Sequence, residues 1–475
     1  MRRRALTWFA LLLFGTTGGI LTYSLSSAQQ GEFVLPTTKV GPTVGRPQPS
    51  PRLLPPSVTQ DPAPVAGAPL VAPTPAPSVQ PAAFVAPMSE RSTPAARNAP
   101  LAKYGDLEHQ PALTRQMILS SQRGIEWLSR YNQQSGRFVP GFLPALNAPM
   151  DGDHFLRQAA ATVALARAAA FTGDERHAIR ATHAVLGLLT ETKEEPKGIR
   201  YPALPSVVCN RLAASGMLVL AIHELPTPSP ELLDRAEELC AFIRSRQQAD
   251  GSLQYGDTPE ATAADPAGVR AHPGPALHAV AVSQKRRPAA WKPELVRKAM
   301  PYYRQVFKQS PHPTFVPSQT AAFAEAFMQT KDATFASFVF EMNDWLVQLQ
   351  YAQLDPRRQT WFGGFQSYEG GQIVATPPDF QTALYAQSLA EACRVTRQIP
   401  DLDRYNRYRT SLVRSLQFLT TLQYTDEACQ HFAAHYRPAV VGGFHPSHQD
   451  GNLRVEDTAQ SVSAMLQFFN CGTAE

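Results

Sequence analysis

The chain has 475 residues, of which 43% are hydrophobic and 17% are charged, and its formal net charge is +5 at pH 7. Arg2, Arg3 and Arg4 supply three of these positive charges, so the rest of the chain is nearly neutral and has no long basic run. This balance argues against a nucleic-acid partner.

The N-terminus has the pattern of a targeting segment. The positive "MRRR" precedes the apolar "ALTWFALLLFGTTGGILTYSL", and small residues lead up to Ala28. We expect residues 1–28 to be a signal peptide or, alternatively, an uncleaved membrane anchor that tethers the chain through residues 5–24. Either leader predicts an extracytoplasmic protein: periplasmic, secreted, or anchored to the inner membrane with the folded part outside.

Residues 29–105 are predicted to form a disordered linker. Seventeen of the 43 prolines fall between Gly31 and Pro100, mostly among Ala, Val, Ser and Thr. Such a segment cannot bury enough apolar surface to fold, so we expect an extended spacer. One large folded domain then covers 106–475.

Helical periodicity dominates from Pro111 onward. It predicts twelve helices, at about 112–133, 154–172, 175–191, 205–224, 229–247, 274–285, 290–308, 316–330, 332–350, 378–397, 402–424 and 455–470. No alternating run is long enough to build a major sheet. Twelve helices correspond to six helical hairpins.

The lengths of the connections alternate along the chain. Those after even-numbered helices are short, as in "TGD" and "PTPS", whereas the largest loops, 134–153, 248–273, 351–377 and 425–454, follow odd-numbered helices. Even helices such as "FLRQAAATVALARAAAF" are apolar or small nearly all round, and odd helices keep a charged stripe. We therefore predict an inner ring of even helices, whose N-termini surround a cavity rimmed by the long loops.

A short repeat ends four of the outer helices. "WLSRYN", "FIRSRQ", "WLVQLQ" and "FLTTLQ" share an aromatic residue and, five positions later, an amide. Three of them lead toward turns with Gly and an apolar residue: "QQSGRF", "QQADGSL" and "TWFGGF". We expect the amide to satisfy carbonyls left open at the helix end.

These turns resemble the Gln-Trp repeats of terpenoid cyclases and prenyltransferases, with "RQQADGSL" the best copy. The six alternating hairpins are equally similar to six-hairpin glycosidases and toroid polysaccharide lyases. The resemblance covers about 111–470 and implies an α/α toroid.

An acidic pair opens the last predicted helix. "RVEDTA" is similar to the "DxDDTA" motif of class II terpenoid cyclases, which places Glu456 on the protonating position and Asp457 beside it. The first Asp of that motif is Arg454 here, and a cation would lower the pKa of an acid that must stay protonated. This departure counts against cyclase chemistry.

The same helix carries a polar stripe of Glu456, Gln460, Ser463, Gln467 and Asn470. In an inner helix the stripe would face the cavity. The alternative is a partly solvated terminal helix whose acids only complement the helix dipole.

Other predicted inner helices also start with polar groups. These groups are Asp153, His154 and Arg157; Asn210 and Arg211; and Asp379, Gln381 and Tyr385. Asp153 and Asp379 are equally suited to be ordinary N-caps. His154 and Arg157 do not fit a capping role as simply.

Two glycine-aromatic loops precede inner helices, "WFGGFQSYEGG" and "VGGFHPSHQDGNLR". Their aromatic residues Trp361, Phe365, Tyr368 and Phe444 could stack on sugar faces or could instead plug the loops into the toroid. His445, His448 and Asp450 in the second loop match no well-defined metal site, so no metal is expected.

Cysteine usage indicates that the fold does not depend on disulfides. Cys209, Cys240 and Cys393 lie in apolar helical patterns typical of core thiols, whereas Cys429 and Cys471 could form a bridge.

The sequence thus predicts an all-α (α/α)6 toroid that acts on or binds a polysaccharide or other glycan. A hydrolase would use a pair of carboxylates from Asp153, Glu369, Asp379, Glu456 and Asp457. A lyase would need a neutralising Arg or Asn and a Tyr or His base. A non-catalytic binding toroid and a terpenoid cyclase stay open as alternatives, and no cofactor is expected.

Overall fold

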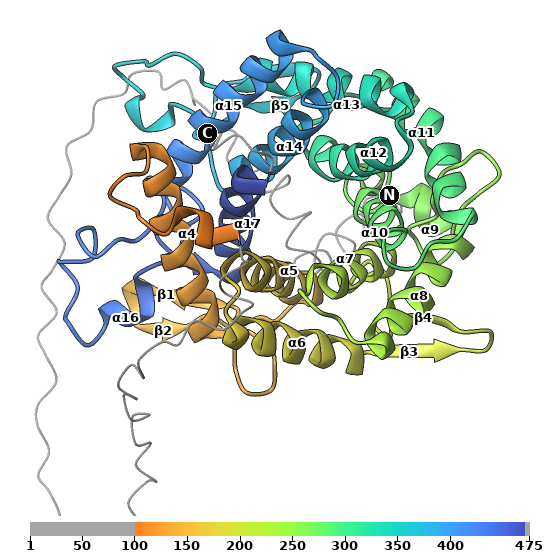
Figure 1. The fold of residues 1–475 in the computed structure, drawn as a ribbon, viewed down its shortest axis with the longest axis horizontal. Coiled ribbons are helices and arrows are strands. Elements are labelled where there is room, and N and C mark those ends of the chain that lie inside the picture. Colours follow the sequence, from red (N-terminus) through yellow and green to blue (C-terminus); the bar gives the residue numbers. More distant parts are fainter. Residues whose placement is uncertain (1–99, 471–475) are drawn as a thin grey trace, which may run out of the picture. The chain divides into compact units, whose positions relative to one another are not determined.

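The computed structural model describes residues 100–470; the predicted leader, and the linker up to residue 99, lie outside this range. Within it, long α-helices alternate between an inner and an outer ring (Figure 1). The inner helices are α5 (Phe155–Thr172), α7 (Arg211–Glu224), α10 (Pro273–Ser283), α12 (Val316–Thr330), α14 (Gln381–Thr396) and α17 (Val455–Asn470). The outer helices are α4 (Ala112–Tyr131), α6 (Glu175–Thr190), α8 (Pro230–Ser245), α11 (Trp291–Gln309), α13 (Ala333–Leu346) and α15 (Leu402–Thr420).

The inner helices form a closed circle. Each packs against the next one along the chain, and the last, α17, packs against both α14 and the first inner helix, α5. The outer helix α4, from the start of the domain, covers α17 and completes the sixth hairpin. The predicted all-α toroid of six helical hairpins is confirmed.

Small side chains allow the inner helices to approach closely. In α5 the alanines Ala159, Ala161, Ala164, Ala166 and Ala168 are all fully buried, so both faces of the helix are covered. Outer helices keep a charged outer face. On α15, for example, Arg404 and Arg407 pair with Asp344 of α13 at 3.0 and 2.7 Å.

The loops hold short elements that the sequence does not predict. Three small sheets form, with the strand orders β2-β1-β7, β3-β4 and β5-β6. The strands are β1 (Gly141–Leu143), β2 (Ala148–Pro149), β3 (Thr192–Glu195), β4 (Ile199–Pro202), β5 (Ser367–Glu369), β6 (Gln372–Val374) and β7 (Leu453–Arg454). Short helices are η3 (Pro100–Tyr104), η4 (Pro144–Leu146), α9 (Pro259–Ala264), η5 (Gly268–Arg270), η6 (Pro313–Phe315), η7 (Val347–Leu349), η8 (Gln359–Trp361) and α16 (Arg437–Val440).

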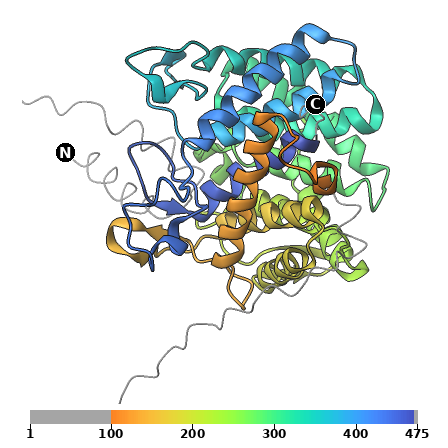
Figure 2. The same ribbon diagram turned by 60° about the vertical axis from the view of Figure 1, so that its left-hand side comes forward.

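One of these sheets joins the two ends of the domain. In antiparallel register, β1 of the first long loop pairs with β7, directly before α17, through Gly141 with Arg454 and Phe142 with Leu453. Figure 2 shows the two loops side by side at one end of the ring.

The predicted repeat forms four equivalent turns. Asn132, Gln247, Gln350 and Gln423 each make an isolated β-bridge, to Phe138, Leu253, Phe365 and Phe444 respectively. The expectation that these amides bind carbonyls at the end of their own helix is wrong. They bind carbonyls of the turn and of the next outer helix. The three Gln side chains donate to Leu295, Ser411 and Ser120 carbonyls, each at 2.9 Å. The repeat therefore fastens neighbouring outer helices together.

The folded unit begins a few residues before the predicted boundary at 106. The helix η3 lies within the predicted linker, and Tyr104 packs against Phe469 of α17 with ring centroids 5.2 Å apart. No helix among residues 100–470 has the length and apolarity required to cross a bilayer.

The four cysteines within the described range are buried. Cys209, Cys240 and Cys393 are buried thiols, in agreement with the prediction, and Cys429 is buried as well. The bridge considered between Cys429 and Cys471 cannot be placed, because Cys471 lies outside residues 100–470.

A glycine pair tests the role of the repeated turns. Gly363, in the third turn, has φ +88°, and an added Cβ would lie 2.2 Å from the Arg414 carbonyl oxygen on α15. Gly371, at the tip of the β5-β6 hairpin, has φ +83° and nothing within 4 Å of an added Cβ. Both Ala variants carry the strain of a positive φ, about 1 kcal/mol, but only Gly363→Ala also forces the turn away from α15.

We expect Gly363→Ala to lower the free energy of unfolding by at least about 2 kcal/mol more than Gly371→Ala does. Urea denaturation followed by circular dichroism measures both. Equal losses would contradict the fastening role of the turn.

Candidate active site at the inner-helix rim

The inner ring encloses a cavity of about 190 Å³ to which all six inner helices contribute. It is lined from Leu156 to Arg167 along α5 and from Glu456 to Gln467 along α17. Both stretches correspond to a depth of about 16 Å along a helix axis. The cavity therefore runs from the rim of inner-helix N-termini down into the ring.

The polar stripe predicted on α17 faces this cavity. Glu456, Gln460, Ser463 and Gln467 all line it, which rules out a solvated terminal helix. The side chain of Asn470 lies outside the described part of the structure. The stripe starts at the rim with Glu456.

The start of α17 is held by two segments. The Val455 amide donates to the Pro140 carbonyl at 2.9 Å, and the Thr458 hydroxyl accepts from the Phe444 amide at 3.0 Å. With the helix fixed in this way, Glu456 lines the cavity whereas Asp457 is fully buried. The two adjacent acids thus have different surroundings.

Glu456 is paired with an arginine of the neighbouring inner helix. Arg157 Nε lies 3.0 Å from Glu456 Oε1, although neither group makes a well-aligned hydrogen bond. Burial raises the pKa of Glu456, and the positive charge of Arg157 opposes this effect. The Glu456 carboxyl is therefore a buried acid whose charged form is supported by one cation.

Asp457 is a buried acid without a hydrogen-bond partner on either oxygen. Its nearest cation is Arg454, with Nη1 at 4.0 Å from Oδ2. Burial, and after it the negative charge of Glu456, raises the pKa of Asp457 well above its ordinary value, and Asp379 adds to the effect. Of the two acids, Asp457 is the one whose pKa is raised more strongly.

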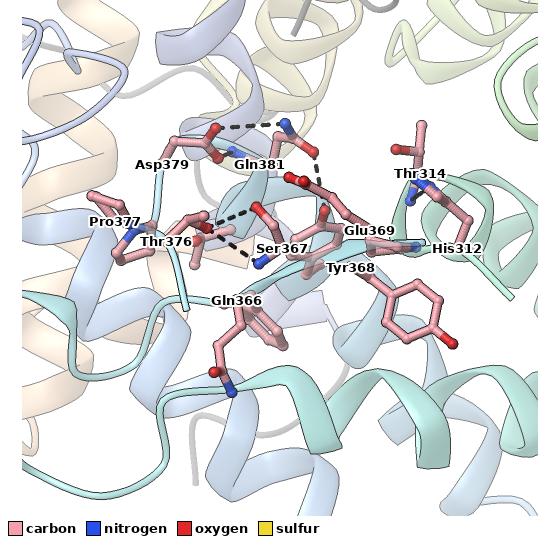
Figure 3. A pocket seen from close by; sticks show the side chains of 15 residues that line it. His312, Thr314, Gln366, Ser367, Tyr368, Glu369, Thr376, Pro377, Asp379 and Gln381 are labelled. Carbon is pink, nitrogen blue, oxygen red and sulfur yellow. Dashed lines mark hydrogen bonds between the residues drawn. The ribbon is translucent and has the colours of Figure 1, made fainter. Parts of the chain in front are cut away.

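Asp379 lies just before α14, in a second pocket of about 80 Å³. Its Oδ1 accepts from the Gln381 amide at 2.9 Å, although the N-cap of α14 is Phe380 and not Asp379 as considered, and the Tyr385 hydroxyl donates to Gln381 Oε1 at 3.0 Å (Figure 3). Burial raises the pKa of Asp379 to about 6, in spite of the hydrogen bonds from Gln381. No cation contributes to this shift.

The two pockets share a wall. Gln381, Tyr385 and Thr314 line both of them, with Asp379 on one side and Glu456 on the other. Figure 3 shows Tyr368 and Glu369, both from β5, over the smaller pocket. The structure therefore brings together Asp379, Glu456 and Asp457 of the four predicted catalytic residues.

The fourth, Asp153, lies apart from them. Arg137 Nε and Gln158 Nε2 each bind one of its carboxylate oxygens at 2.8 Å. Asp153 is exposed and lines neither pocket described above. These contacts indicate a structural role.

His154 is the N-cap of α5 and also lines the central cavity. Its Nδ1 accepts from the Leu156 amide at 3.2 Å, while its Nε2 is buried. Burial, and then the charge of Arg157, lowers the pKa of His154. The ring is therefore neutral at neutral pH, and it also interacts with the Val208 backbone.

Asn210 and Arg211 are occupied by loop contacts. Asn210 caps α7 through the Ala213 amide at 3.1 Å and donates to the Tyr255 carbonyl at 3.0 Å. Arg211 pairs with Asp257 at 2.9 Å. Neither lines the central cavity.

The predicted sugar-stacking residues divide between the two alternatives. Phe444 is fully buried and Phe365 nearly so, with Phe365 packed edge-on against Tyr385 at 4.9 Å. These two plug their loops into the toroid. Trp361 lies under Arg358 at 4.6 Å, outside both pockets, and Tyr368 alone is a partly exposed pocket residue.

Sequence reasoning missed a polar group deeper in the cavity. Arg167 binds Glu224 at 2.9 Å and Gln387 at 3.3 Å, and Gln387 Nε2 donates to Gln460 Oε1 at 2.8 Å. A lone Arg in the Ala-rich sequence of α5 was the available signal. Its partners Glu224 and Gln387 belong to other helices, so the sequence of α5 alone does not reveal them.

The residues between 100 and 470 hold no cluster of three or more potential metal ligands. The three possible ligands in the second glycine-aromatic loop bind three different groups. His445 binds the Ser447 carbonyl at 2.7 Å, His448 binds Thr421 at 3.0 Å, and Asp450 pairs with Arg454 at 3.1 Å.

Comparison with known proteins gives structural neighbours only; no family model and no curated protein matches the sequence. A cellobiose 2-epimerase from Bacillus thermoamylovorans B4167 superposes with TM-score 0.54 and 11% identity over 75% of this chain and 98% of its own. An unsaturated glucuronyl hydrolase from Streptococcus agalactiae gives 0.53 and 10%, over 77% and 95%. An alpha-1,6-mannanase from Salegentibacter sp. HEL1_6 gives 0.52 and 12%, over 74% and 98%.

The chain has the α/α-toroid fold. At these identities the likeness concerns architecture, and the toroid's reaction has to be argued from its own residues.

Asp457 provides a test of the buried acids. Its folded-state pKa is raised, so the folded toroid binds this proton more tightly than the unfolded chain does, and stability falls as pH rises through the folded pKa. Asp457→Asn is neutral at all pH values and nearly isosteric with the protonated acid.

We expect Asp457→Asn to unfold at a higher temperature than the wild type at pH 8, and the two to lie within about 1 kcal/mol of each other at pH 4. Scanning calorimetry from pH 4 to 8 measures the difference, with the exposed Glu108→Gln as control. A variant less stable than the wild type at pH 8 would show that Asp457 is needed as a carboxylate.

Proposed function

We propose that the toroid is a glycoside hydrolase in which Asp379 and Glu456 act on a glycan bound at the inner-helix rim. The observation that carries this proposal is the pair of acids on opposite sides of the wall formed by Gln381 and Tyr385. Glycoside hydrolysis uses two carboxyl groups that flank the scissile bond, one protonated and one ionised.

The surroundings of the acids suggest how the roles divide. Asp379 has no cation to stabilise its anion, and its pKa of about 6 suits a general acid near neutral pH. Glu456 has Arg157 at 3.0 Å, so it is the better candidate for the ionised base or nucleophile. Asp457, buried behind it and protonated, would keep a second negative charge away from Glu456.

A lyase is supported less well. Two bases were considered: burial raises the pKa of the Tyr385 hydroxyl, which already donates to Gln381, whereas His154 lines the central cavity. The neutralising groups considered, Asn210 and Arg211, are bound in loop contacts away from the cavity. A candidate base therefore lies at the cavity, but neither of the neutralising groups considered lies beside it.

Two further considerations support a glycan substrate. The structural neighbours named above include a mannanase and a glucuronyl hydrolase, and a variant of the mannanase was solved with alpha-1,6-mannotriose. The charged and apolar pattern of residues 1–28 favours action outside the cytoplasm, where polysaccharides are accessible.

Isosteric amides test the two roles. We expect Asp379→Asn and Glu456→Gln each to lower kcat by at least about 100-fold, because each removes one proton-transfer group. Release of reducing sugar from a panel of α- and β-linked polysaccharides measures this, and Asp153→Asn serves as the carboxylate that should be dispensable. If no glycan is cleaved but one binds, the toroid is a non-catalytic binding protein.

The pH profile tests the assignment of the acid. Asp379 must be protonated to act, so kcat should fall about tenfold per pH unit above its pKa of about 6. A steady-state profile from pH 4 to 9 provides the measurement. Activity that is constant up to pH 9 would rule out Asp379 as the general acid.

A further inference from the structure

Between its mouth and its far end, the wall of the central cavity is mostly apolar. Five of the six inner helices place apolar side chains on its wall, including Leu156, Val163, Met217, Leu220, Ala321 and Leu384. This wall is continuous because α5, α7, α10, α12 and α14 are successive neighbours in the ring. The polar stripe of α17 occupies the remaining side.

A sugar chain suits this space poorly. Buried hydroxyl groups need hydrogen-bond partners, and sugar faces favour aromatic rings. Apart from Phe380 and Tyr385, near the start of α14, the apolar wall offers neither. An aliphatic chain, in contrast, gains free energy with each methylene that it buries there.

The polar groups in the depth of the cavity mostly satisfy one another. Gln387 binds Gln460 at 2.8 Å, Arg167 binds Glu224 at 2.9 Å, and Glu391 pairs with Arg394 at 2.8 Å. At the mouth Glu456 is held by its ion pair with Arg157, and at the far end Gln467 Oε1 has no hydrogen-bond partner. Polar groups therefore lie at the mouth, along α17 and at the far end, with the apolar wall between them.

We propose that the cavity holds the aliphatic chain of a glycolipid, whose sugar lies at the mouth beside Glu456 and Asp379. The polar mouth, the aliphatic wall and a depth of about 16 Å match a sugar joined to a single chain. This inference rests on the proposed function for the sugar and specifies the substrate class: a glycan carrying a lipid chain.

A homologous series of ligands tests it. Calorimetric titration of the full chain with alkyl glucosides from butyl to decyl, below their micelle concentrations, should show affinity rising about fourfold per methylene. The rise should stop once the chain reaches the end of the cavity. Affinity that does not depend on chain length overturns the inference.

Two variants locate the chain. Ala321→Phe fills part of the cavity and should weaken decyl glucoside at least about 30-fold while changing butyl glucoside less than about threefold. Ala333→Phe, on the exposed start of α13, is the matched control and should change neither ligand. If Ala321→Phe does not fold, Met217→Ala replaces it, and the plateau should then move to a longer chain. Unchanged series in the folded variants would place the chain elsewhere and overturn the inference.

The outcomes separate the two proposals. Cleavage of soluble oligosaccharides together with chain-independent binding would leave the hydrolase proposal standing and overturn the lipid chain. Binding that depends on chain length and is abolished by Ala321→Phe, without cleavage of any glycoside, would support the lipid chain in the cavity and overturn the hydrolase proposal.

Discussion

The closure of the ring by α17 is the constraint on which the remaining structure depends. This last helix has to fit between α14 and α5 and be covered by α4, which lies more than 300 residues earlier in the chain. Contacts between α4 and the loop before α17 keep the ring closed. Trp127 Nε1 and the Tyr131 hydroxyl both donate to the Ala439 carbonyl, at 3.0 and 2.9 Å, and β1 pairs with β7. The loop-closure entropy of joining such distant segments is recovered only when all these contacts form together.

The same closure assembles the candidate site. Glu456 belongs to α17 and Arg157 to α5, so their ion pair exists only in the closed ring. Asp379 comes from a third segment, and its negative charge contributes to the raised pKa of Asp457. Burying three carboxyl groups beside one another costs stability, since each prefers water in its charged form. A closed helical ring can bear this cost because its core is large and the fastening turns keep the helices from separating.

Much of the fold could be predicted from local patterns. The alternation of short and long connections, and the contrast between the Ala-rich α5 and the charged α15, indicate which helices are inner and which are outer. The amide five residues after an aromatic marks the turns, although its partners on the next helix depend on tertiary packing. The site could be predicted only in part. The same sequence signature, a polar residue just before an inner helix, marks Asp153, Asn210 and Asp379. The three residues differ only in the loop residues that contact them. Arg137 neutralises Asp153, Tyr255 accepts a hydrogen bond from Asn210, and Asp379 is half-buried beside a pocket.

The aliphatic wall could not be predicted for a related reason. A leucine or alanine on an inner helix looks the same in the sequence in two cases: when it packs against a neighbouring helix and when it lines an internal cavity. The polar stripe of α17 is informative because polar residues on a surrounded helix need partners, and Gln460 finds one in Gln387. The neighbouring apolar residues carry no such signal. The distance between the inner helices decides whether an apolar residue lines the cavity or is packed in the core. That distance depends on the position in which the two ends of the domain hold α17. The depth of the cavity and the meeting of its acids are thus consequences of one closure.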